Sequence, residues 1–144
     1  MYFNQSGLDL LRQFEQFRSA PYKDQGGKLT IGYGHLIKAG ESFTAMTQTQ
    51  GNTLLAKDVG LAEAAYRRRV KVDLNENQYA AVVCWIFNLG EGNLQQSTLL
   101  TKLNAQAFDD VPGEILRWHR VDNKPSRGLI RRRAAEAMLF LLPV

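Results

Sequence analysis

The sequence predicts an α+β fold, in which a small antiparallel sheet lies between one N-terminal helix and a mostly helical body. Apolar residues recur at three- and four-residue spacing before about residue 18 and again after residue 47, which is typical of helices. Between these stretches, glycines and short strand-like runs indicate tight turns and a small sheet. A cleft between a sheet lobe and a helical lobe is a natural ligand site.

The first helix is expected to begin at Ser6, whose hydroxyl group can cap it. Its apolar spacing continues to about Arg18, and Pro21 is expected to end it because proline lacks the backbone N–H that a helix needs.

Short strands are expected between about residues 22 and 44. Gln25-Gly26-Gly27 predicts a turn, and the run 28–33 that follows it is strand-like. Gly40-Glu41 predicts a further turn.

Two capping boxes predict the starts of the next two helices. Thr47 with Gln50 begins a long helix that ends near Val70, and Asn75 with Gln78 begins a central helix that is apolar on most sides. The central helix is expected to end at Asn88-Leu89-Gly90, and further helices are expected near 97–105, 110–120 and 127–141.

The chain is basic, with 18 Lys and Arg against 14 Asp and Glu, a formal charge of +4 and a pI near 9.4. This balance suggests a polyanionic partner such as nucleic acid, an anionic membrane or a cell wall. The clusters Arg67–Arg69 and Arg131–Arg133 are expected either to be solvated helix faces or to steer the protein toward an anionic wall. The single cysteine, Cys84, excludes an internal disulfide.

Three residues could support chemistry, although each also has an ordinary structural explanation. Glu15 lies on the apolar face of the first helix, where loss of water would favour the protonated carboxyl group, or it forms a surface pair with Arg18. Asp24 is a common turn residue, and Thr30 is a common strand residue.

Taken together, these residues form a motif with defined spacing. It comprises Phe14-Glu15, Tyr22-Lys23-Asp24 and Gly27-Lys28-Leu29-Thr30-Ile31-Gly32-Tyr33-Gly34-His35. The arrangement resembles the signature of the phage endolysins of glycoside hydrolase family 24, the lambdoid-type muramidases. The resemblance continues downstream in Asn77-Gln78-Tyr79, Ile86–Gly90, Ser97–Leu100, Gly128-Leu129, Arg131–Arg133, Glu136 and Phe140.

The resemblance implies a single lysozyme-like domain over residues 1–144, with a β-rich lobe at about 20–46 and a helical lobe at about 1–19 and 47–144. It implies hydrolysis of the β-1,4 bond between N-acetylmuramic acid and N-acetylglucosamine in bacterial peptidoglycan. In such a reaction Glu15 is the general acid, and Asp24 and Thr30 hold the attacking water and stabilise the transition state.

The resemblance also assigns supporting roles to other residues. It places Leu36, Phe87 and Asn88 in the saccharide cleft, although Phe87 is equally expected in the core. Arg127 is expected either to approach Glu15 from the C-terminal lobe or to be solvated.

The resemblance also implies a structural ion pair between His35 and Asp58. No second His, Cys or carboxylate lies at ligand spacing from His35, so neither a metal site nor a cofactor is expected.

Two other functions remain open on the sequence alone. A lytic transglycosylase would break the same bond without water, and a non-catalytic basic module would bind a cell wall or nucleic acid. In the endolysin interpretation the partner is peptidoglycan, with no nucleic acid and no stable membrane insertion, and the protein is a monomer. The N-terminal residues lack a signal-peptide pattern. The protein is therefore expected in the host cytoplasm until holin-dependent release to the periplasm and cell wall.

Overall fold

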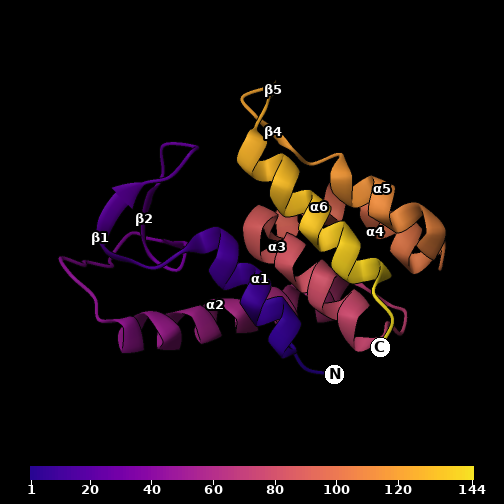
Figure 1. Ribbon diagram of the computed structural model, residues 1–144, viewed down its shortest axis with the longest axis horizontal. Coiled ribbons are helices and arrows are strands. Elements are labelled where there is room, and N and C mark those ends of the chain that lie inside the picture. Colours follow the sequence, from indigo (N-terminus) through magenta and orange to yellow (C-terminus); the bar gives the residue numbers. More distant parts are fainter.

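A small sheet lobe and a larger helical lobe make up the structure, a computed structural model that describes residues 1–144 (Figure 1). The helices are α1 (Gln5–Glu15), α2 (Gln48–Arg69), α3 (Glu76–Gln96), α4 (Thr98–Asn104), α5 (Val111–Leu116) and α6 (Arg127–Leu141), with a short 3-10 helix η1 at Phe108–Asp110. The strands are β1 (Arg18–Lys23), β2 (Leu29–Gly32), β3 (His35–Leu36), β4 (Arg120–Val121) and β5 (Lys124–Pro125). The predicted α+β class, with a sheet lobe beside a helical lobe, is confirmed.

The first helix differs from its prediction at both ends. Its cap is Asn4, whose side chain accepts a hydrogen bond from the Gly7 amide at 3.0 Å, whereas Ser6 lies inside the helix. The helix ends at Glu15 because Gln16 adopts a φ of 43°, and the chain then enters β1. Pro21 therefore lies within β1, at a register irregularity of this edge strand where no ladder hydrogen bond is required.

The sheet has the antiparallel order β1-β2-β3. Thr30 pairs with Tyr22 on one side and with Leu36 on the other, so the three strands are held in a fixed register. The turn from β2 to β3 contains Gly34 at a φ of +71°, a conformation that favours glycine.

Both predicted capping boxes are present. Thr47 and Gln50 exchange hydrogen bonds at the start of α2, and Asn75 and Gln78 do the same at the start of α3. The predicted end of the central helix is a kink at Gly90 (φ 85°), beyond which a second helical segment continues to Gln96.

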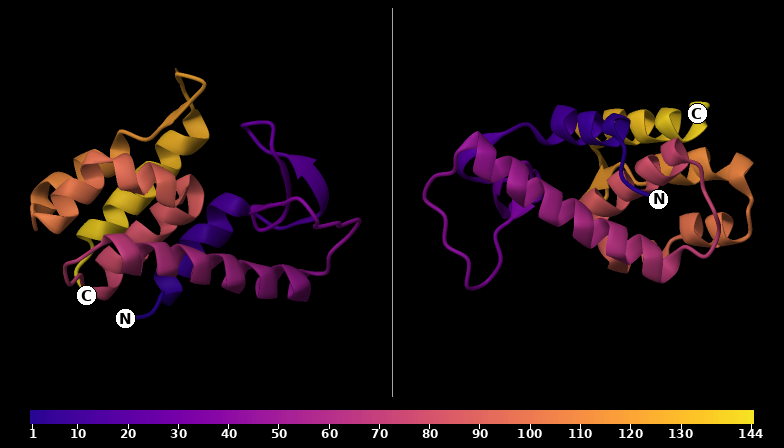
Figure 2. Two further views of the ribbon diagram at one scale, coloured as in Figure 1. Left: turned by 180° about the vertical axis from the view of Figure 1, so that it is seen from behind. Right: turned by 90° about the horizontal axis from the view of Figure 1, so that it is seen from below.

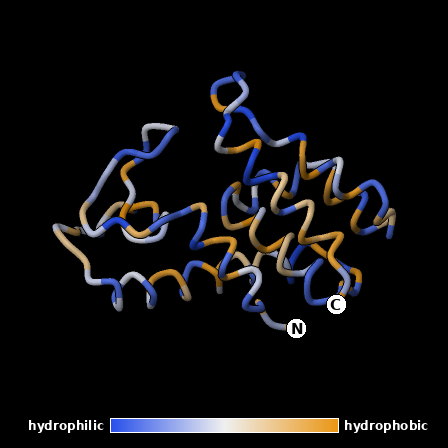
Figure 3. The backbone as a smooth tube through the Cα atoms, in the orientation of Figure 1, coloured by the Kyte–Doolittle hydropathy of each residue, from blue (hydrophilic) through white to orange (hydrophobic).

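The core lies in the helical lobe around α3, which contacts α1, α2 and α6. Residues 80–86 of α3 are buried, and the fully buried ring of Trp85 packs edge-on against Trp118 at a centroid distance of 5.3 Å. Helix α2 contacts β2 and β3 as well as α3, so it joins the two lobes (Figure 1). Hydrophobic segments recur along the helices of the helical lobe, whereas the tip between β1 and β2 is hydrophilic (Figure 3).

The hairpin β4–β5 was not predicted. A helix was expected at 110–120, but α5 ends at Leu116 and the hairpin follows it. Asp122 and Asn123 form its turn with φ values of 49° and 64°. Asp and Asn tolerate the left-handed conformation that this turn requires. The Asp-Asn pair was therefore the sequence signal that could have predicted the hairpin.

Candidate active site

Glu15 lies where the sheet lobe contacts the helical lobe. It is the last residue of α1, and its side chain is 15% exposed. A Cβ atom built on Gly34 would lie 2.6 Å from Cδ of Glu15, so only glycine fits at that turn position. The absence of a side chain at residue 34 therefore lets the turn lie directly against the carboxyl group.

The cationic partner of Glu15 comes from α6. Nη1 of Arg132, a residue that is 4% exposed, donates to Oε2 of Glu15 at 2.5 Å. The surface pair with Arg18 does not form, since the Arg18 guanidinium lies over the Tyr22 ring at 4.7 Å from its centroid.

Of the two alternatives expected for Arg127, the structure shows the solvated side chain and not the approach to Glu15. Arg127 is exposed at the start of α6, and Arg132 makes the contact instead. Five residues correspond to a rotation of about 140° around an α-helix, so the two side chains point to nearly opposite faces.

A cavity of about 520 Å³ lies beside Glu15. Its lining includes Asp24 and Tyr22 from the sheet lobe and Asn88 from α3. Nε2 of Gln25 donates to Oγ of Ser126 at 2.8 Å, which links the tip of the β1–β2 hairpin to the N-cap of α6. The structure thus brings Glu15 and Asp24 into the lining of one cavity between the lobes.

Asp24 also has the turn role expected of it. Its Oδ1 accepts from the Lys28 amide at 2.8 Å, and its own amide donates to the Lys28 carbonyl at 2.8 Å. The structure gives Oδ2 no hydrogen-bond donor, so one carboxylate oxygen of Asp24 is free for chemistry.

Thr30 is not among the residues that line this cavity. It is 2% exposed in β2, where its hydroxyl donates to the Lys28 carbonyl at 2.9 Å. Because that bond uses the hydroxyl proton, Oγ1 of Thr30 can still accept a hydrogen bond.

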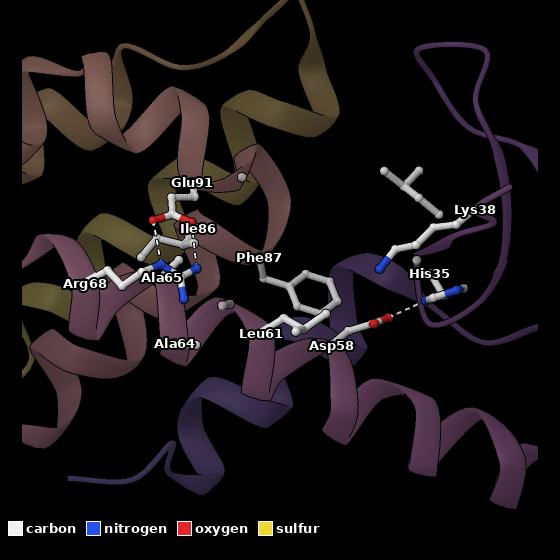
Figure 4. Close-up of a pocket in the computed structure, with 14 residues that line it drawn as sticks. His35, Lys38, Asp58, Leu61, Ala64, Ala65, Arg68, Ile86, Phe87 and Glu91 are labelled. Atoms are coloured by element: carbon white, nitrogen blue, oxygen red, sulfur yellow. Dashed lines mark hydrogen bonds and ion pairs between the residues drawn. The ribbon is translucent and has the colours of Figure 1, made fainter.

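Leu36 and Phe87 line a second cavity, of about 400 Å³, together with residues of α2 (Figure 4). Phe87 projects between the lobes, with Leu61 and Asp58 of α2 nearby. Gly34 lines this second cavity and lies against Glu15, which lines the first. Phe87 and Asn88 are neighbours at the end of the first segment of α3. Phe87 lines this second cavity, and Asn88 lines the cavity of Glu15.

His35 lies between two carboxylates on the sheet side of this second cavity. Its Nδ1 is 2.7 Å from Oδ2 of Asp58, and its Nε2 is 2.9 Å from Oε1 of Glu41. Burial disfavours the charged ring, but the hydrogen bonds to Glu41 and Asp58 outweigh it and raise the pKa of His35. Nothing in the local sequence pattern pointed to Glu41.

Within the cluster Arg131–Arg133 only Arg131 is exposed, so the expectation of a solvated or steering face is wrong for Arg132 and Arg133. Arg132 and Arg133 are 4% and 0% exposed, and Nη2 of Arg133 donates to Oδ1 of Asn88 at 2.8 Å. A signal was available, because residues 129, 132, 133, 136, 137 and 140 share the spacing of the buried helix face. Two arginines at such positions indicate buried ion pairs rather than surface charge.

Three comparisons with known proteins agree with this architecture. The family described as phage lysozyme matches residues 12–136. An endolysin of Acyrthosiphon pisum secondary endosymbiont phage 1 is 35% identical, over 97% of this chain and 98% of the relative.

Two solved structures are similar over 99% of both chains. A mutant of the lysozyme of phage P22 is 33% identical with a TM-score of 0.83. The muramidase domain of SpmX from Asticaccaulis excentricus is 28% identical with a TM-score of 0.87.

None of the helices combines the length and apolar character needed to cross a bilayer.

Proposed function

Since this chain belongs to the phage lysozyme family and is a hydrolase that lyses peptidoglycan, we propose that it breaks the β-1,4 bond between N-acetylmuramic acid and N-acetylglucosamine. The observation that carries this proposal is the shared cavity of Glu15 and Asp24 between the two lobes. Glycoside hydrolysis requires two carboxyl groups with different environments on either side of the scissile bond.

Glu15 acts as the general acid in this proposal. Arg132 occupies its Oε2 atom, so Oε1, which faces Gly34, is the oxygen that delivers the proton to the leaving sugar oxygen. The side chain is mostly shielded from water, which limits competing proton exchange with solvent.

Asp24 acts as the base that activates water. Its free Oδ2 atom takes a proton from the water molecule, whose oxygen then bonds to the anomeric carbon as the glycosidic bond breaks. Oγ1 of Thr30 accepts the second proton of that water in a hydrogen bond, which holds the water in place. A water held in this way predicts inversion at the anomeric carbon.

Asn88, Leu36 and Phe87 bind the glycan in the two cavities. The Asn88 amide offers hydrogen bonds to an N-acetyl group, and Leu36 and Phe87 offer apolar contact to sugar faces.

The test is the clearing of chloroform-treated Gram-negative cells by purified protein. The wild-type protein should clear them, and Glu15→Gln, which keeps the shape but loses the acid, should not. Glu114→Gln is a matched control, because Glu114 is also ion-paired, at 3.1 Å to Arg117, but lies outside both cavities of the cleft. Full activity of Glu15→Gln would contradict the assignment.

Mass spectrometry of the released fragments tests the reaction type. Hydrolysis leaves reducing ends, whereas a lytic transglycosylase leaves 1,6-anhydro ends, and a non-catalytic module releases no fragments. Reducing ends are expected.

The route to the cell wall is a further prediction. We expect lysis of the producing cell only when a holin is expressed together with this chain. Lysis without a holin would contradict holin-dependent release. A monomer is expected in size-exclusion chromatography.

A further inference from the structure

A buried carboxylate lies behind the cleft, outside both of the cavities described above. Glu136 of α6 has a fully buried side chain. Its Oε2 accepts from Nε of Arg132 at 3.2 Å and from Nη2 of Arg133 at 3.0 Å, and its Oε1 lies 2.8 Å from Nε of Arg133. One carboxylate therefore contacts two guanidinium groups at once.

Each of these arginines continues to a residue of the proposed active site. Arg132 donates to Glu15 at 2.5 Å, and Arg133 donates to Asn88 at 2.8 Å. Glu136 is thus one side chain removed from both the acid on α1 and a saccharide contact on α3. Helices α1 and α6 lie on the same side of the helical lobe, which makes the first of these contacts possible (Figure 2).

The cluster is costly to bury, and an apolar core would not need it. Replacing a buried ion pair by apolar side chains of similar volume is often neutral or stabilising, so stability alone is a weak explanation for the cluster. Its two arginines reach Glu15 and Asn88 of the proposed site, and Arg133 also donates to the Trp118 carbonyl at 3.5 Å.

The cluster comprises two guanidinium groups and two carboxyl groups. Arg132 contacts the carboxyl groups of Glu15 and Glu136, and Arg133 contacts that of Glu136. On its other sides Glu15 faces Tyr22 and Asp24 of the sheet lobe, and Arg132 also donates to the Cys84 carbonyl of α3 at 3.4 Å.

We propose that Glu136 is a positioning residue for the lysozyme reaction, which holds Arg132 against Glu15 and Arg133 against Asn88. This inference rests on the proposed function, because it assigns a role relative to the acid and the glycan. Glu136 touches neither the substrate nor the reacting atoms. It acts through Arg132, which lines the cavity of Glu15, and through Arg133, which is buried behind Asn88.

Loss of the Glu136 charge has two consequences that loss of packing does not. The positive charge of Arg132 is then less compensated and favours ionised Glu15, so the alkaline limb of the activity curve moves to lower pH. Arg133 loses its anchor, so Asn88 is less well oriented and saccharide binding weakens.

The test is Glu136→Gln, measured for kcat, KM and pH dependence on soluble peptidoglycan fragments, with chitotriose as the binding probe. We expect kcat to fall at least about tenfold, the alkaline limb to move to lower pH, and chitotriose to bind several-fold more weakly. Leu103→Ala is the matched control, because Leu103 is fully buried in α4 of the same lobe and lies outside the cluster. It should lower the unfolding temperature and leave the pH limb and chitotriose affinity unchanged.

Wild-type kcat and pH dependence in Glu136→Gln would overturn the inference, and so would a loss of activity with an unmoved pH limb. If Glu136→Gln does not fold, the double variant Arg133→Met and Glu136→Met removes the inner ion pair and keeps its volume. That variant should still show a lower kcat and weaker chitotriose binding, and wild-type values would again refute the role. Activity of Glu15→Gln would instead overturn the proposed function itself, so the two failures are distinguishable.

Discussion

Replacing Gly34 with alanine should remove most of the lytic activity while lowering stability only modestly. Residue 34 has a φ of +71°, and an added Cβ would lie 2.6 Å from Cδ of Glu15. Non-bonded carbon atoms prefer separations of about 3.5–4.0 Å, so the carboxyl group must retreat by about 1 Å. The turn and the acid cannot both keep their positions.

The magnitudes for activity and stability differ. A displacement of about 1 Å can cost about 100-fold in rate, which corresponds to about 2.7 kcal/mol of transition-state stabilisation. A left-handed backbone conformation at a non-glycine residue costs about 1–2 kcal/mol of folding free energy. We therefore expect a folded protein with roughly one hundredth of the wild-type activity.

The assay compares the rate of cell clearing with the free energy of unfolding in urea. Gly40→Ala is the matched control, because Gly40 has a φ of +88° and an added Cβ would meet no atom within 4 Å. It should lose a similar amount of stability and keep its activity. Near-wild-type activity in Gly34→Ala, or an equal loss in Gly40→Ala, would refute the steric argument.

Two further predictions concern stability. The raised pKa of His35 means that its ion pairs stabilise the fold fully below about pH 6.5, the ordinary value, and that this contribution is lost as pH rises through the folded value. Asp58→Asn should therefore cost about 1.5–3 kcal/mol of folding free energy at pH 6. Between pH 6 and 9 its free energy of unfolding in urea should depend less on pH than that of the wild-type protein. An unchanged slope would contradict this linkage. Thr47→Ala removes the cap of α2 and should cost about 1 kcal/mol in urea unfolding, whereas Thr53→Ala, an exposed hydroxyl in the same helix, should cost less. Equal losses in the two threonine variants would contradict the capping role of Thr47.

Much of the fold follows from short stretches of sequence. The capping boxes at Thr47 and Asn75, and the bounds of α6, were predicted because each depends on residues within one or two helical turns. The same holds for the motif of Glu15, Asp24 and Thr30, whose members lie within 16 consecutive residues. Errors occurred where a local signal was ambiguous, as at the end of α1, where a left-handed Gln16 stops the helix before Pro21.

By itself, the sequence determined the class of fold, the turns of the sheet lobe and the three residues proposed for chemistry. Only the tertiary structure decided that Arg132 and not Arg127 meets Glu15, and that Glu41 joins His35 and Asp58. The physical reason is that the contact between Arg132 and Glu15 joins residues 117 positions apart, and it depends on how α6 is rotated against α1 and α3. A run of charged residues in a sequence suggests a solvent-exposed surface. The packing of α6 against α1 and α3 instead placed Arg132 and Arg133 in the core with Glu136.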